Sequence, residues 1–229
     1  FISEENESYF LETESVHLNT LHKKFSLYKL RSRVTLLPRP DLKVYALWGD
    51  THPLPLNEKK EGDTFKKLFV DPRLSTLGLR GRGDDLAFET HPSSAEDYTL
   101  HRLKLGIPEA GQDLISEKTI PLEAGLDDLH AINWTKGCYI GQELTARTKH
   151  QGLVRKRLIP VKINGPLPSF GAKILNGDNP VGEIRTLAKS YGMALLRLEA
   201  LHTSAKLKCE NSFLTPTIPS WMKISPSEN

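Results

Sequence analysis

The segment from residue 136 to residue 143 contains residue types at a spacing that could support thiol chemistry. Cys138 lies between Gly137 and Gly141, and Lys136 precedes it by two positions. Glycine tolerates positive φ and close approach by another chain segment, so we expect this cysteine in a turn of unusual backbone conformation. A neighbouring ammonium group favours the thiolate, which is the nucleophilic and metal-binding form of cysteine. The same pattern also fits a small, buried and inert side chain in a tight turn.

Basic residues are concentrated around and after this cysteine. Residues 136–162 include seven lysines and arginines against one acid, Glu143, whereas the whole chain has a net charge of only +3. The local excess could meet an anionic ligand such as a polyglutamate tail, a phosphate or RNA, or it could be a solvated face. Because side chains alternate along a strand, we expect Arg155 and Arg157 to share one face and to form an anion-binding cluster with Arg147.

Length and composition exclude several classes of protein. The chain has 229 residues, 38% of them hydrophobic and 26% charged, which is typical of a soluble globular protein of one or two domains. Cys138 and Cys209 are its two cysteines, too few for a disulfide scaffold or a zinc ribbon. Apolar runs are far shorter than the ~18 residues of a membrane span, so we expect no membrane contact.

The compartment is inferred from the same features. Unpaired cysteines and the absence of a visible signal peptide suit a reducing interior. We expect the bacterial cytoplasm, with the mitochondrial matrix as the alternative. Because the chain begins at Phe1, we also expect that its natural N-terminus is missing.

Apolar periodicity and turn residues predict the elements that position these residues. Helices are expected near residues 18–28 and 95–105, and strands at 33–37, 43–48 and 68–70, with a glycine-rich turn region at 78–83. From residue 155 onward, short strands alternate with Gly and Pro turns: 158–163, 173–175, 181–184 and 192–198. This spacing predicts a small β-barrel. We therefore divide the chain into an α+β region at 1–150, a barrel at 151–215 and a tail at 216–229 that wraps or frays.

The cysteine segment resembles the K-G-C-Y-x-G-Q-E signature of the YgfZ-type proteins, relatives of the glycine-cleavage T protein that include iron–sulfur cluster assembly factors. The likeness continues in Asp71-Pro72-Arg73, in Gly106-Ile107-Pro108-Glu109 and in Pro121–Leu126, and covers roughly residues 10–200. It implies an α+β fold in which T-protein-type units form a ring around a tetrahydrofolate-sized cavity, followed by a C-terminal β-barrel. The family's opening segment should precede Phe1.

The resemblance also implies a function, the maturation or repair of [4Fe–4S] proteins, which is not the work of a conventional enzyme. The implied partners are iron–sulfur scaffold or carrier proteins and client enzymes. Cys138, with Lys136 beside it, is the reactive thiol in this interpretation. One thiolate cannot hold a cluster, for which four ligands are usual, so we expect no stable metal site and at most transient binding of iron or a cluster at Cys138.

Two alternatives remain at this stage. The first is a tetrahydrofolate-dependent aminomethyltransferase like the T protein itself. The resemblance assigns a folate-like cofactor to a set of six residues: Arg102, Glu123, Tyr139, Gln142, Glu143 and Arg147. However, Lys104 stands where that family has a pterin-anchoring glutamate, and an ammonium group can only donate hydrogen bonds, so we predict weak or absent tetrahydrofolate binding.

The second alternative is an RNA-binding module built on the basic segment. The net charge is low and the basic residues are not interleaved with a series of aromatic residues, so we do not expect nucleic acid as a partner. We expect the protein to be a monomer.

Overall fold

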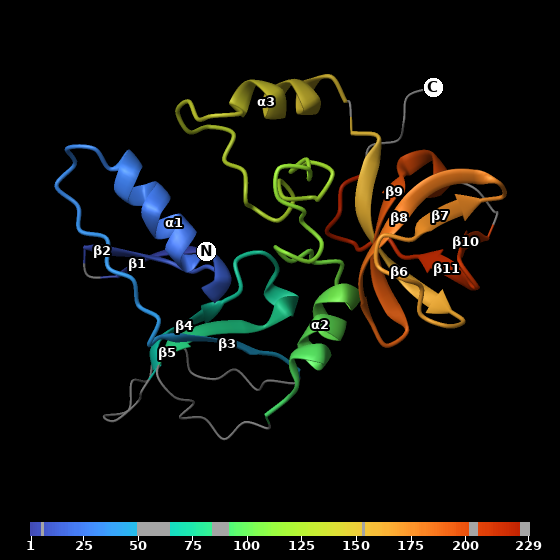
Figure 1. Cartoon of the computed structure of the whole chain (residues 1–229), viewed down its shortest axis with the longest axis horizontal. Coiled ribbons are helices and arrows are strands. Elements are labelled where there is room, and N and C mark those ends of the chain that lie inside the picture. The colour runs from blue at the N-terminus through green and yellow to red at the C-terminus, as the bar shows by residue number, and fades with distance from the viewer. Residues whose placement is uncertain (6, 50–64, 84–91, 153, 202–205, 225–229) are drawn as a thin grey trace. The chain divides into compact units, whose positions relative to one another are not determined.

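The computed structural model describes residues 1–5, 7–49, 65–83, 92–152, 154–201 and 206–224 (Figure 1). The chain divides into two compact units, each made of several segments. The first unit comprises Phe1–Tyr45, Pro55–Leu68 and Gly81–Phe88, and the second comprises Ala46–Leu54, Phe69–Arg80 and Glu89–Asn229. The second unit contains the cysteine segment and the predicted barrel.

The first unit begins with a hairpin and a helix. Strands β1 (Ile2–Glu5) and β2 (Ser8–Leu11) pair antiparallel, and α1 (Ser15–Tyr28) follows. The helix was expected from the spacing of its apolar residues. The hairpin was not predicted, because acidic residues are frequent in its sequence. The strand predicted at 33–37 is wrong: these residues have extended or irregular backbone without a pairing partner in the described part of the chain. A β-branched or apolar run becomes a strand only when a neighbour accepts its hydrogen bonds.

A three-stranded sheet has the order β3 (Lys43–Leu47), β5 (Leu79–Gly83), β4 (Phe65–Val70), with the short 3-10 helix η1 (Ser75–Leu77) before β5. Residues 78–83 were expected to form a turn, and this expectation is wrong because Leu79–Gly83 form strand β5. At Gly78, with φ of 98°, an added Cβ would lie 2.1 Å from the Leu47 carbonyl oxygen. The glycine therefore allows the segment after η1 to approach β3.

The predicted barrel is confirmed, and it is a closed barrel of six strands (Figure 1). Its strands are β6 (Lys156–Asn164), β7 (Lys173–Asn176), β8 (Asn179–Ala188), β9 (Tyr191–Arg197), β10 (Leu207–Cys209) and β11 (Ser212–Pro216). They close in the order β10-β11-β6-β9-β8-β7 with antiparallel neighbours. Strands β10 and β11 were not predicted, and η2 (Leu198–Leu201) follows β9.

Alternation along the strands fills the barrel. In β6, Ile159, Val161 and Ile163 belong to the central apolar cluster, while Leu158 packs in a second cluster. The chain after β11 contributes to the same core, since Met222 is buried there and the indole N–H of Trp221 donates to the Leu105 carbonyl at 2.8 Å. The described part of the tail, up to residue 224, thus packs against the barrel and the chain after α2.

Helix α2 (Ala95–Lys104) is attached to the barrel. Ser94 caps its first turn by accepting a hydrogen bond from the Asp97 amide at 3.1 Å. Leu103 has no exposed surface and packs with Leu158 of β6 and Met193 of β9. Among the described residues, no helix is long and apolar enough to cross a bilayer.

Candidate functional site

The cysteine segment is a turn that leads into helix α3 (Gln142–His150), which the sequence did not predict. The Asn133 side-chain oxygen accepts hydrogen bonds from the Thr135 and Lys136 amides at 2.9 and 3.1 Å. The Tyr139 amide donates to the Gln142 side chain at 3.2 Å, and the Gln142 amide donates back to the Tyr139 carbonyl at 3.1 Å. These bonds hold the backbone around Cys138 without burying it.

The two glycines have different roles. Gly141 starts α3 with φ of 88°, in the left-handed region, as the sequence predicted. Gly137 has no positive φ, and an added Cβ would meet nothing within 4 Å. The open space around Gly137 shows no close approach by another described segment at this position, whereas Gly141 uses the backbone freedom of glycine.

Cys138 is exposed, and so are two apolar neighbours in the turn and helix. Ile140 is 97% exposed and Leu144 is 67% exposed, four residues apart. Cys209 is the opposite case, since it lies in β10 without exposed surface, and burial raises the pKa of its thiol. Of the two thiols, Cys138 is the one that a reagent or a partner protein can reach.

Lys136 lies beside the turn with its ammonium over an aromatic ring. Its Nζ is 4.9 Å from the centroid of the Tyr139 ring, a cation–π arrangement. The predicted influence of Lys136 on the Cys138 thiol stays a prediction.

Four of the six residues assigned to a cofactor lie together in the turn and α3. Glu143 and Arg147 form an exposed ion pair at 2.7 Å, Gln142 closes the turn, and Tyr139 is half-buried. An exposed pair four residues apart on a helix contributes little to stability. The structure thus leaves Glu143 and Arg147 accessible, and their role in binding a cofactor stays a prediction.

The other two residues of that set lie outside this segment. Arg102 is fully buried, with Nη1 2.6 Å from Asp113 and Nε 2.9 Å from Glu109, so a ligand could reach it only by displacing these partners. Glu123 is half-buried; burial raises the pKa of its carboxyl, and nearby Lys156 opposes this shift. Cofactor binding by both residues stays a prediction.

Lys104 lies at the end of α2 with its side chain exposed. Its Nζ is 5.4 Å from the centroid of the Tyr191 ring. A pterin needs an acceptor for its amino and ring N–H groups, which an ammonium cannot supply. The guanidinium of Arg102 is paired with Glu109 and Asp113, and weak or absent tetrahydrofolate binding stays a prediction.

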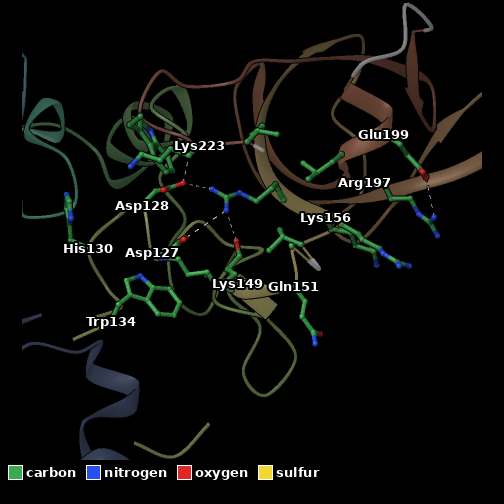
Figure 2. A pocket seen from close by; sticks show the side chains of 18 residues that line it. Asp127, Asp128, His130, Trp134, Lys149, Gln151, Lys156, Arg197, Glu199 and Lys223 are labelled. Atoms are coloured by element: carbon green, nitrogen blue, oxygen red, sulfur yellow. Dashed lines mark hydrogen bonds and ion pairs between the residues drawn. The ribbon is translucent and has the colours of Figure 1, made fainter. Parts of the chain in front are cut away.

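A pocket of about 1470 Å³, here called the basic pocket, is lined in part by Trp134 and Lys149, which precede and follow the cysteine segment in the sequence (Figure 2). Its lining comes from the turn region after α2, the end of α3, the start of β6, the end of β9 and the tail. The lining residues that carry charge are Lys149, Arg155, Lys156, Arg157, Arg197 and Lys223, against Asp127, Asp128 and Glu199. Trp134 and Trp221 supply aromatic surface that the sequence did not place near these charges.

The predicted cluster of Arg147, Arg155 and Arg157 does not exist. Arg157 is buried, donates to the Leu122 carbonyl at 2.8 Å and pairs with Asp128 at 2.7 Å. Arg147 pairs with Glu143 and does not line the basic pocket. The sequence argument failed because it could not show that the carboxylates of residues 127–128 fold against the first residues of β6.

The structure offers no ready metal centre in its described residues. Among them, no group of three or more His, Cys, Asp or Glu side chains is arranged to hold a metal ion. Any iron or cluster bound at Cys138 would need further ligands from elsewhere.

Comparisons with known proteins match the barrel and most of the chain. Residues 155–224 match the family model for the CAF17 C-terminal beta-barrel domain. The chain is 38% identical over 231 residues to the mitochondrial iron-sulfur cluster assembly factor IBA57 of Mus musculus, and 33% identical over 227 residues to that of Homo sapiens. Each alignment covers 93% of this chain and 64% of the relative. A homologue from Phaeosphaeria nodorum is 30% identical over 237 residues, covering 89% of this chain and 57% of that protein.

Proposed function

We propose that this chain, whose homologues are IBA57 iron-sulfur cluster assembly factors of a YgfZ/GcvT-like family, acts in the maturation or repair of [4Fe–4S] proteins. The chain spans less than two thirds of the length of the mouse and human relatives. Its CAF17-type barrel is the part for which the family match and the fold agree. A T-protein-like ring of α+β units around a central cavity belongs to the same proposal.

The observation that carries the proposal is the exposed thiol of Cys138 in a turn that exposes Ile140 and leads into α3, where Leu144 is exposed. A catalytic thiol for a small substrate usually sits in an enclosed, partly polar site. An exposed thiol on a turn that is followed by exposed apolar side chains is suited to contact with another protein. A partner could then supply the other ligands of a cluster, or a thiol for a mixed disulfide.

Scaffold or carrier proteins and client enzymes are the proposed partners. The named relatives are mitochondrial, which supports the mitochondrial matrix as the compartment, whereas the expected bacterial cytoplasm has no support. We do not propose aminomethyl transfer, because the Lys104 ammonium offers no acceptor to a pterin and the Arg102 guanidinium is paired with Asp113.

Complementation of cells that lack the protein tests this proposal. Cys138→Ala should reduce the activity of [4Fe–4S] enzymes at matched protein abundance, while enzymes without clusters keep their activity. Leu144→Ala, which shortens an exposed neighbour without touching the thiol, should give a smaller loss. Full activity with Cys138→Ala would show that the thiol is not the functional group.

A further inference from the structure

We propose that the basic pocket binds an acidic segment of a partner protein and so presents that partner to the turn that carries Cys138. The inference rests on the proposed function, because the partner is taken to be a protein in cluster maturation. Trp134 and Lys149 both line the pocket. The chain segment between them, residues 135–148, contains Cys138. Trp134 and Lys149 also touch, since the Lys149 Nζ is 3.7 Å from the centroid of the Trp134 ring.

The charges of the pocket favour an anionic occupant. Among the lining carboxylates, Asp128 pairs with Arg157 at 2.7 Å and Glu199 pairs with Arg197 at 3.3 Å. Asp127 lies 3.9 Å from Arg157, and its Oδ1 has no hydrogen-bond partner among the described residues. Over the whole lining, six basic residues stand against these three carboxylates. Figure 2 shows these pairs within the lining.

The remaining four basic residues of the lining are Lys149, Arg155, Lys156 and Lys223. In the part of the chain that the structure describes, none of them lies within ion-pair distance of a carboxylate. Lys156 does act electrostatically on the half-buried carboxyl of Glu123. Several cations without a neutralising partner attract an acidic segment.

The size and surface of the pocket favour a peptide over a small molecule or RNA. Its volume of about 1470 Å³ exceeds the ~300–1,000 Å³ of ordinary small-molecule sites. The lining also includes apolar side chains, among them Val154, Trp221 and Ile224. A segment with both carboxylates and apolar side chains matches this lining. One face of the Trp134 ring is occupied by Lys149, so it is a poor platform for base stacking.

Binding of a defined probe to the whole chain tests the inference. The probe is a fluorescein-labelled peptide of about twelve residues, rich in glutamate and containing leucine, whose binding is followed by fluorescence anisotropy. The pocket variant is Arg155→Glu with Lys223→Glu, since both side chains are exposed there. The matched control is Lys162→Glu with Lys208→Glu, which makes the same charge change on exposed barrel residues outside the pocket.

We expect saturable binding that weakens at high salt, falls at least tenfold in the pocket variant, and stays within about twofold in the control. Equal weakening in both variants, or no binding by the native chain, would overturn the proposal. Competition by millimolar inorganic phosphate would instead identify a small-anion site, and tighter binding of a single-stranded RNA would identify a nucleic-acid site; both also overturn it.

Failure of peptide binding can be distinguished from failure of the proposed function. Cys138→Ala should bind the peptide as the native chain does, because Cys138 is not part of the lining. Loss of client activity in cells with Cys138→Ala, together with absent peptide binding, would keep the proposed function and reject the peptide site. The reverse pair of results would keep the peptide site and reject the role of the thiol.

Discussion

Replacing Asp113 with alanine should strongly destabilise the second unit. One oxygen of this fully buried carboxylate accepts from Arg102 at 2.6 Å and from the Glu109 amide at 3.0 Å, and the other accepts from the Thr186 amide at 3.2 Å. Removing one member of a buried ion pair costs about 3–5 kcal/mol. Since Arg102 would keep Glu109 at 2.9 Å and the Ile107 carbonyl at 3.1 Å, we expect the lower end, about 3 kcal/mol.

Urea unfolding followed by tryptophan fluorescence measures this loss, because Trp48, Trp134 and Trp221 all belong to the second unit. The control is Asp178→Ala at an exposed turn position, which should change the free energy of unfolding by less than about 0.5 kcal/mol. A loss below about 1 kcal/mol in Asp113→Ala, the value of an exposed pair, would refute the reasoning.

Three further predictions follow from the thiols and from Lys104. A chromogenic disulfide reagent should label Cys138 quickly in the native protein and Cys209 only after denaturation. One thiol per chain should therefore react in the native protein and two in the denatured protein. Rapid reaction of both thiols in the native protein would contradict the burial of Cys209. Burial raises the pKa of Cys209 above its usual 9.0, so the unfolded chain loses this proton first. The contribution of the protonated thiol to the free energy of unfolding is fully present below pH 9. It should be lost as pH rises through the folded-state pKa. Cys209→Ala should remove this decline in urea titrations at rising pH, and an identical decline in the variant would contradict the assignment. Calorimetry with tetrahydrofolate should show weak or no binding because of Lys104; low micromolar affinity, about −8 kcal/mol, would mean that other groups anchor the pterin.

Local patterns were sufficient for several features. The spacing of apolar residues predicted α1 and α2, and regular turn residues predicted four barrel strands, because alternation and helix periodicity are properties of short segments. The eight-residue cysteine segment identified the family likeness that the comparisons support. The short strands β10 and β11 were not predicted, because strands of three and five residues show too little alternation to be recognised in the sequence.

Charge placement was decided by the tertiary structure. Sequence spacing put Arg157 in a basic cluster, but the fold brings Asp127 and Asp128 against it and buries it. Conversely, Lys223 lies far along the chain from Lys149, yet both line the basic pocket. Arg102 likewise forms an ion pair with Asp113, eleven residues away, and its side chain is buried. The interaction energy of a charged side chain depends on the distance and burial of its partner, which the sequence does not give. The packing of distant segments therefore determines which cations are paired with carboxylates and which remain for a ligand.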